Sequence, residues 1–333
     1  MYKKKKNKIN KFIVITTINP ATKAIKKFAS FKDWKLVLVG DKKSKAIKSE
    51  DNTYFLSIED QKNFDFNIVN FSPYNHYSRK NIGYLYAMKN GADIIYETDD
   101  DNFPTSSWSF PDFHSSNILM TDGKYFNIYR YFTSKFVWPR GFPLDEIRKS
   151  SNFLIDNTRS CDVGVWSGMA NNDPDVDAIF RLLFNKEIKF RKKDSVALDK
   201  HIYSPFNSQN TLWNKNSFAW MYLPVTVNPR FTDILRGYIA QRLFWHHNLR
   251  LGFIGPTVYQ ERNSHNLMKD FSDELECYSN IKEIVSILES TKLGNNIYSN
   301  IRKIYKNLAK KKYVRNKELE TLGAWLKDIK NLF

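Results

Sequence analysis

Apolar runs alternate with helix-type segments over the first hundred residues, and this alternation constrains the fold more than any other feature. Asn19 and Pro20 are typical of a helix start, and Gly91 is typical of the position just after a helix. Strand and helix in strict succession predict an α/β fold with a mostly parallel central sheet and helices on both faces. The predicted strands lie at 12–18, 35–40, 67–71 and 92–98, and the helices between them include 21–30 and 73–90.

Three carboxylates follow the last of these strands in the segment "YETDDDN". A doubly wound sheet binds its ligand at the carboxyl ends of its strands, which is where Asp99, Asp100 and Asp101 fall. Asp99 and Asp101 point to the same side of an extended strand, roughly 7 Å apart. Such a pair of hard oxygen ligands favours Mg²⁺ or Mn²⁺. The alternative is an exposed acidic turn, which the position after a buried strand disfavours.

The net charge limits the classes of partner that suit this protein. The 333 residues carry 52 Lys+Arg against 35 Asp+Glu, a formal charge of +17. A basic surface suits nucleic acid, anionic lipid or a nucleotide. No nucleic-acid-binding motif is present, so we expect no specific nucleic-acid partner. Two cysteines exclude a disulfide framework, and the absence of a signal or membrane-spanning segment predicts a cytoplasmic protein.

The strand ends and the following helix supply candidates for binding a nucleotide donor. Neither a G-x-G-x-x-G nor a P-loop pattern is present. Thr16 ends the first strand, and Asp41 follows the second, where a carboxylate accepts hydrogen bonds from ribose or base. Arg79, Lys80 and Asn81 precede the acidic strand, and cations there would bind a diphosphate opposite the metal. A solvated helix face is the alternative for this group.

Another acidic segment, "NNDPDVDAIFRLLF", resembles a calcium loop at first sight. It lacks the glycine at the sixth loop position and has Phe184 where the last glutamate belongs. A helix start with Asp173 as N-cap is the better interpretation. Asp175 and Asp177 stay candidates for contact with the acceptor.

A later helix, predicted over 231–245, carries the candidate general base. Asp233 lies near its start, where it would take the proton from an acceptor hydroxyl. Its alternative role is to complement the helix dipole. Arg236 and Arg242 on the same helix are candidates for binding phosphate or sugar hydroxyls.

Several long stretches together resemble the STELLO-type glycosyltransferase family. They are "VLVGDKK", "PYNHYSRKNIGYLYAMKNGADIIYETDDDN", "PDVDAIFRL", "YSPFNSQNTLW" and "LPVTVNPRFTDILRGYIAQRLFW", within about 12–288. The resemblance implies a GT-A fold, related to the Rossmann fold, with a nucleotide-sugar donor and Mn²⁺ or Mg²⁺. It also makes His265 a candidate third metal ligand, because a late histidine commonly returns to the cation in GT-A enzymes. Otherwise His265 is a surface loop residue.

The resemblance implies transfer of a sugar, with UDP-sugar expected as donor, to a glycan or lipid-linked acceptor. Three rivals stay open. A nucleotidyltransferase would carry a glycine-rich loop after the first strand, which is absent here. A nucleotide-sugar mutase would need no separate acceptor. A non-catalytic scaffold would keep the fold and fail to bind metal and donor.

Domain organisation follows from the same patterns. We predict a basic end over 1–10, a GT-A domain over 11–279 and a helical extension over 280–333. The donor half of the domain would cover about 11–104 and the acceptor half about 105–279. The extension is predicted to pack on the domain, with peripheral contact to an anionic membrane as the alternative. Trp166 and Trp213 are either sugar-stacking residues or core residues.

Overall fold

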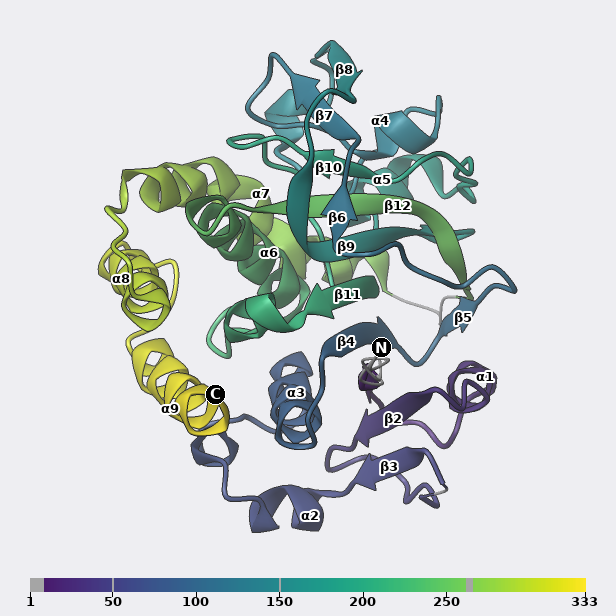
Figure 1. Ribbon diagram of the computed structural model, residues 1–333, viewed down its shortest axis with the longest axis vertical. Coiled ribbons are helices and arrows are strands. Elements are labelled where there is room, and N and C mark those ends of the chain that lie inside the picture. Colours follow the sequence, from purple (N-terminus) through teal and green to yellow (C-terminus); the bar gives the residue numbers. More distant parts are fainter. Residues whose placement is uncertain (1–8, 50, 150, 262–265) are drawn as a thin grey trace, which may run out of the picture.

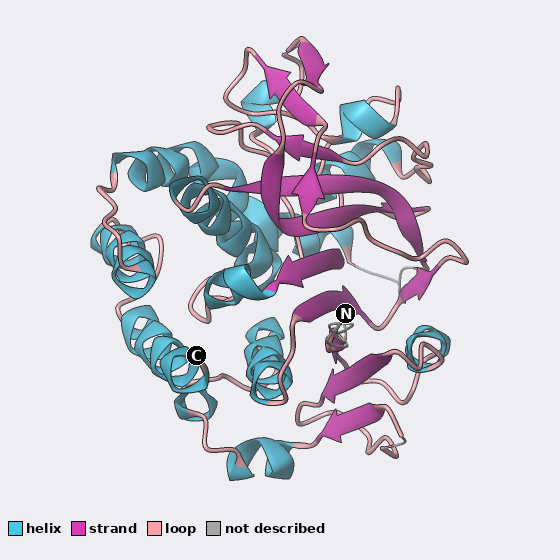
Figure 2. Ribbon diagram, in the orientation of Figure 1, coloured by secondary structure: helices cyan, strands magenta, loops and turns pink. Residues whose placement is uncertain are grey.

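The computed structural model describes residues 9–49, 51–149, 151–261 and 266–333. It is an α/β structure in which one twelve-stranded sheet runs through the molecule with helices packed around it (Figures 1 and 2). The α/β class predicted from the sequence is therefore confirmed. The strands are β1 Lys11–Thr16, β2 Trp34–Val39, β3 Thr53–Leu56, β4 Ile94–Asp99, β5 Asn102–Pro104, β6 His114–Ser115, β7 Ile118–Thr121, β8 Phe153–Asp156, β9 Cys161–Asn171, β10 Val196–Leu198, β11 Asn210–Asn214 and β12 Leu249–Gln260.

Helices of both the α and the 3₁₀ type connect these strands. The α-helices are α1 Lys23–Ala29, α2 Ile58–Asn63, α3 Lys80–Lys89, α4 Tyr129–Phe132, α5 Ala178–Phe184, α6 Pro229–His246, α7 Leu267–Ser290, α8 Ile297–Lys310 and α9 Lys317–Leu332. The 3₁₀ helices are η1 Asn67–Asn70, η2 Tyr77–Arg79, η3 Leu144–Glu146 and η4 Lys215–Trp220.

Sheet order is β3-β2-β1-β4-β11-β9-β12-β10-β7-β8, with β5 on β12 and β6 on β9. Strands β3, β2, β1 and β4 are parallel to one another. Strand β11 then enters antiparallel between β4 and β9, and β7–β8 is also an antiparallel pair. The prediction of a mostly parallel sheet thus holds for the N-terminal strands and not for the whole sheet.

Alternate residues of β1 reach cores on opposite faces of the sheet. Phe12 and Val14 join the larger core, to which α3 and α6 contribute. Ile13 and Ile15 join the smaller core, with Phe28 of α1. Period-two alternation in a strand that is apolar throughout produces this double burial, as expected for a parallel strand covered on both faces.

The predicted strand at 67–71 is wrong, because this segment contains the 3₁₀ helix η1. The Asp328 carboxylate of α9 accepts hydrogen bonds from the backbone N–H groups of Asn67 and Ile68, at 2.8 and 2.9 Å. A partner more than 250 residues away therefore fixes a turn that local β propensity does not predict. The third strand is β3, just before α2.

Two helices begin later in the chain than the sequence predicted. Helix α5 begins after Asp177, whose Oδ1 accepts the N–H of Phe180 at 2.8 Å, so Asp173 is not its N-cap. Helix α3 begins only at Lys80, after the turn η2, and not at residue 73. The predicted C-terminal signal is confirmed, since Gly91 has a φ of +77° directly after α3.

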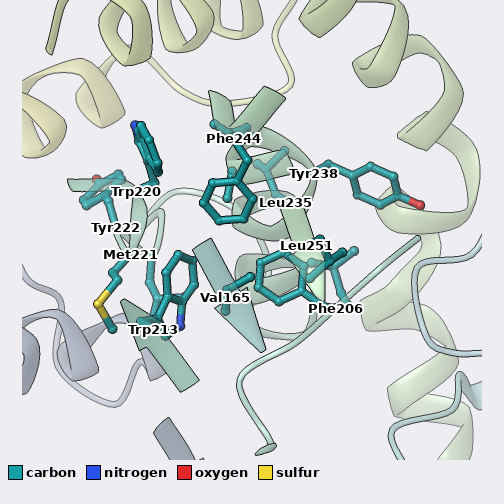
Figure 3. Close-up of a cluster of buried hydrophobic side chains, with 14 of the residues drawn as sticks. Val165, Phe206, Trp213, Trp220, Met221, Tyr222, Leu235, Tyr238, Phe244 and Leu251 are labelled. Carbon is teal, nitrogen blue, oxygen red and sulfur yellow. The ribbon is translucent and has the colours of Figure 1, made fainter. Parts of the chain in front are cut away.

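Trp166 and Trp213 are core residues, each 0% exposed, so the stacking interpretation is wrong. The indole of Trp213 donates to Glu97 Oε1 at 2.7 Å and lies close to Val165 and Phe206 (Figure 3). Both rings lie beside the middle of the sheet, where neighbouring strands exclude a ligand.

The C-terminal helices pack onto the rest of the chain, and α7 continues through the predicted boundary at 280. The fully buried Glu318 of α9 accepts the backbone N–H groups of Val225 and Thr226, at 3.0 and 2.8 Å. Apolar residues of α7, α8 and α9 belong to the larger core. Among the described residues, none of the helices has the length and apolar character needed to cross a bilayer.

Candidate active site

A cavity of about 630 Å³ opens where β1, β2 and β4 end, at the edge of the sheet that the sequence singled out. Its size is within the usual range for a small-molecule site. One wall comes from the N-terminal strands and their loops, and the other from α6 and the segments around Arg140 and Asp175. The predicted residues that line it are Thr16, Asp41, Arg79, Asp99, Asp100, Asp101, Asp175 and Asp233.

The three consecutive carboxylates have different surroundings. Asp100 turns toward the loop after β1, where its Oδ2 accepts hydrogen bonds from Thr17 Oγ1 at 2.5 Å and Asn19 Nδ2 at 3.0 Å. Thr22, the N-cap of α1, donates to the Asp100 carbonyl at 2.6 Å. Asp100 therefore fixes the loop after β1 against the end of β4.

Asp101 has neutral partners. Its Oδ2 accepts from Gln260 Nε2 at 2.9 Å, and its Oδ1 accepts from Asn102 Nδ2 at 3.3 Å. Burial, and then the charge of Asp99, raise the pKa of Asp101 to about 7. Among the described residues, no cation pairs with this carboxyl.

Asp99 has one neutral partner and one positively charged partner. Its Oδ1 accepts from the Tyr77 hydroxyl at 2.8 Å and pairs with Lys80 Nζ at 3.1 Å. Burial outweighs both and leaves the pKa of Asp99 raised. Lys80 itself is completely buried and does not line the cavity.

These carboxylates fit a divalent cation. Both have pKa values raised by burial in one cavity, and Asp101 has neutral amide partners, so a cation would offset the cost of their charges. In the described ranges, no group of three or more His, Cys, Asp or Glu side chains could hold a metal ion. Mg²⁺ is commonly held by one or two carboxylates, with water and substrate phosphates as the remaining ligands. The candidate third ligand, His265, lies outside the described residues.

Arg79 is a buried cation on the donor wall. Only 3% of it is exposed, and it donates to the Gln61 side chain and to the Ser72 carbonyl while stacking on Tyr74. Within the part of the chain that the structure describes, it forms no ion pair with a carboxylate. Burial lowers its pKa, partly offset by Asp41, and an anion in the cavity would supply the missing negative charge.

Asp41 organises the neighbouring loop. Its Oδ1 accepts from the N–H of Lys42 and its Oδ2 from the N–H of Asn75, both at 2.7 Å. The loop that precedes η2 is thereby fixed against the end of β2. Thr16, at the end of β1, is half-buried at the same edge.

The acceptor wall is built around one arginine. Arg140 binds Asp175 through Nε and Nη2, both at 2.8 Å, and its Nη2 also contacts both oxygens of Asp233 at 3.2 Å. Asn207 Nδ2 donates to Asp175 at 2.7 Å. Burial alone would raise the pKa of Asp175, but Arg140 outweighs it and the pKa is lowered. Both carboxylates are thus bound by one guanidinium that is 7% exposed.

Asp233 lies deeper in its helix than the sequence suggested. Helix α6 begins at Pro229 after the N-cap Asn228, so Asp233 is its fifth residue and not in the first turn. The dipole effect fades beyond the first turn. Arg140 supplies the positive charge that the prediction assigned to the helix end.

Two hydroxyl groups, those of Tyr77 and Ser208, lie between the carboxylates of the two walls. Each hydroxyl has a single proton, so at most two of the three contacts along this line are hydrogen bonds at one time when both carboxylates are ionised. The Tyr77 hydroxyl contacts Asp99 at 2.8 Å on one side and Ser208 Oγ at 2.5 Å on the other. Ser208 Oγ donates to Asp233 Oδ2 at 3.0 Å. The carboxylate at the end of β4 is therefore connected to the candidate base through two hydroxyl groups.

Besides Lys80, four predicted residues lie away from the cavity lining. Arg236 pairs with Glu97 at 2.8 Å in the core, and Arg242 donates to the Leu288 carbonyl at 3.1 Å. Asn81 donates to the Leu223 carbonyl at 2.8 Å. Asp177 accepts the Trp138 indole N–H at 2.6 Å, and burial raises its pKa to about 7.

Sequence reasoning missed the residues that complete the site, chiefly Tyr77, Arg140, Ser208 and Gln260. The setting of Arg140 in "WPRGFP" carried a signal, because prolines and a glycine mark an irregular loop and such loops often hold functional residues. Gly141 has a φ of +85°, and a Cβ there would lie 2.4 Å from Ile234. The loop therefore approaches α6 closely enough for Arg140 to reach Asp233.

The chain is similar in sequence to known proteins. A family model described as STELLO glycosyltransferases matches residues 230–333. Two proteins of Arabidopsis thaliana, "Probable glycosyltransferase STELLO1" and "Probable glycosyltransferase STELLO2", are each 25% identical over 342 residues. Each match covers 96% of this chain and 44% of the relative, so the chain spans less than half the length of the curated relatives that it matches.

The names of both relatives support a glycosyltransferase role. More narrowly, the family model and the two relatives confirm the resemblance to STELLO-type glycosyltransferases that the sequence stretches indicated.

Proposed function

We propose that this protein is a metal-dependent glycosyltransferase of the GT-A type. It takes a sugar from a nucleotide-diphosphate sugar, with UDP-sugar as the preferred donor, and passes it to a hydroxyl group of a glycan or lipid-linked acceptor. The observation that carries the proposal is the cavity itself. One 630 Å³ space combines the acidic end of β4, the buried cation Arg79 and the carboxylate Asp233.

The donor wall would bind the nucleotide diphosphate. Arg79 donates to phosphate oxygens, and Asp99 and Asp101 hold Mn²⁺ or Mg²⁺. The cation, when bound, neutralises negative charge on the diphosphate leaving group. Lys80 keeps Asp99 oriented through its 3.1 Å contact, and Asp100 keeps the loop after β1 in place.

The acceptor wall would activate the incoming hydroxyl. Asp233 accepts the proton of that hydroxyl as its oxygen bonds to the anomeric carbon and the bond to the diphosphate breaks. Arg140 and Ser208 hold the carboxylate in place for this step. A well-placed general base contributes typically 10²–10⁴-fold in rate.

Asp101→Asn tests the donor site directly. Titration calorimetry with UDP-sugars, in Mn²⁺ and in EDTA, should show metal-dependent binding in the natural chain. The variant should lose most of that dependence, because a neutral amide is a poor ligand for a hard cation. Asp33→Asn, at an exposed acid, is the matched control. Equal donor affinity with Mn²⁺ and with EDTA in the natural chain would overturn the metal assignment.

Turnover with and without an acceptor separates the rivals. Sugar transfer that requires an added glycan or lipid-linked acceptor supports the transferase. Isomerisation of the nucleotide sugar with no acceptor would instead identify a mutase. Absence of any donor binding would identify a non-catalytic scaffold.

A further inference from the structure

Four large apolar side chains are exposed together beside the acceptor side of the cavity. Leu182, Leu183 and Phe184 end helix α5 and are 43%, 67% and 37% exposed, and Phe136 is 55% exposed. The rings of Phe136 and Phe184 lie 6.2 Å apart, which brings two separate segments into one surface. We call these four residues the α5 patch. An exposed apolar group of this kind marks an interaction surface.

A basic rim borders the α5 patch. The Lys135 ammonium donates to the Glu187 carbonyl at 3.4 Å, and the Arg191 N–H donates to the Phe132 carbonyl at 2.8 Å, so the segment after α5 runs beside the segment that holds Phe136. Exposed cations outnumber exposed acids six to two along these segments. The cations are Lys135, Lys186, Lys189, Arg191, Lys192 and Lys193, and the acids are Glu187 and Asp194.

We propose that the α5 patch and its basic rim dock this protein on an anionic membrane surface. Leucine and phenylalanine side chains would enter the boundary between headgroups and acyl chains, while the lysines and Arg191 contact anionic headgroups. This pairing of a small apolar surface with a cationic border complements a negatively charged bilayer. The surface is separate from the basic C-terminal helices α8 and α9, which lie on the opposite side of the molecule from α5 (Figure 1).

The α5 patch is connected to the cavity through its own helix. Arg181 of α5 lines the 630 Å³ cavity and also a neighbouring pocket of about 300 Å³ that includes Lys186 and Glu187. Docking through α5 would bring the acceptor side of the cavity to the lipid surface. This consequence rests on the proposed function and favours a lipid-linked acceptor, whereas docking itself requires no transfer.

Vesicle co-sedimentation of the full chain tests the docking surface. Vesicles of phosphatidylcholine alone and of phosphatidylcholine with phosphatidylserine are compared, without donor or metal. The +17 charge attracts any protein of this kind to anionic vesicles, so the informative variants keep the charge constant. Leu183→Ser removes a 67% exposed leucine from the α5 patch, and Leu154→Ser removes a 58% exposed leucine from β8.

We expect tight binding only to the anionic vesicles, a roughly tenfold loss of affinity for Leu183→Ser, and no loss for Leu154→Ser. Equal losses for both variants, or no loss for either, would overturn the proposal. A concentration-dependent dimer of the natural chain that Leu183→Ser dissociates would also overturn it, by assigning the α5 patch to contact between copies. Donor binding is measured separately, so failure of docking is distinct from failure of the proposed function.

Discussion

The two walls of the cavity differ in how their charged side chains are paired. On the donor wall, Arg79 has no carboxylate partner among the described residues, and Asp101 has amide partners. On the acceptor wall, Arg140 binds both Asp175 and Asp233. The donor wall thus leaves charges for a ligand to balance, as a cation and a diphosphate would. On the acceptor wall both carboxylates already share a cation of the protein itself, which suits a neutral sugar hydroxyl.

The largest expected effect is on turnover at the acceptor wall. Asp233→Asn should lower the turnover number by about 10²–10⁴-fold, because the amide cannot accept the hydroxyl proton. Donor affinity should stay unchanged, since Asp233 belongs to the other wall. Steady-state kinetics with a competent acceptor and calorimetry without one provide the two readouts. Turnover near that of the natural chain would remove Asp233 from the mechanism and leave Asp175 as the next acid to test, because Asp177 lies away from the cavity.

The stability of the folded protein should depend strongly on the ion pairs of the acceptor wall. Arg140→Gln leaves Asp175 and Asp233 buried without their cation and should lower the free energy of unfolding by about 3–5 kcal/mol. Chemical denaturation measures this change. Arg159→Gln is the control, because Arg159 also contacts two acids but its side chain is 48% exposed, and its loss should cost far less stability than the loss of Arg140. Equal losses of unfolding free energy in the two variants would show that burial does not strengthen the contribution of the Arg140 ion pairs.

The affinity for the nucleotide donor should depend on the donor wall. Arg79→Ala should weaken UDP binding by about 1.5–3 kcal/mol, the range for a hydrogen bond to a charged group. Lys80→Ala tests the adjacent residue, and Lys62→Ala, an exposed lysine of α2, is the control. If UDP affinity stays unchanged in both the Arg79 and the Lys80 variants, the diphosphate does not bind on this wall.

The environment of Asp101 should also make stability depend on pH. The folded-state pKa of Asp101 is about 7, above the value of about 3.9 for an unfolded chain. The native state therefore holds a proton that the unfolded state has lost, and its stability should fall as pH rises from about 4 to about 7. Thermal unfolding in EDTA should show that Asp101→Asn removes this part of the dependence. Added Mn²⁺ should stabilise the natural chain at pH 8 and not the variant. Superimposable pH profiles would contradict the assigned environment.

Local patterns were enough for the N-terminal sheet and for the position of the acidic cluster. Strands β1 and β2 are largely apolar runs, and β4 begins with one before its polar end. Burial on both faces leaves little choice of structure for such runs. Because parallel strands end at one edge, the sequence alone predicted that Asp41 and Asp99 to Asp101 would meet. The cavity at that edge contains all of these residues.

Tertiary contacts decided what no local pattern encodes. Arg140 meets Asp233 across 93 positions of sequence, and Asp328 converts the β-branched segment at η1 into a turn from 260 positions away. Strand β11 inserts antiparallel beside β4 and buries Trp213. The sequence alone left open whether Trp213 stacks on a sugar or belongs to the core. Periodicity reports which face of a segment is buried, whereas the partner of a charged group is fixed only when distant segments pack together.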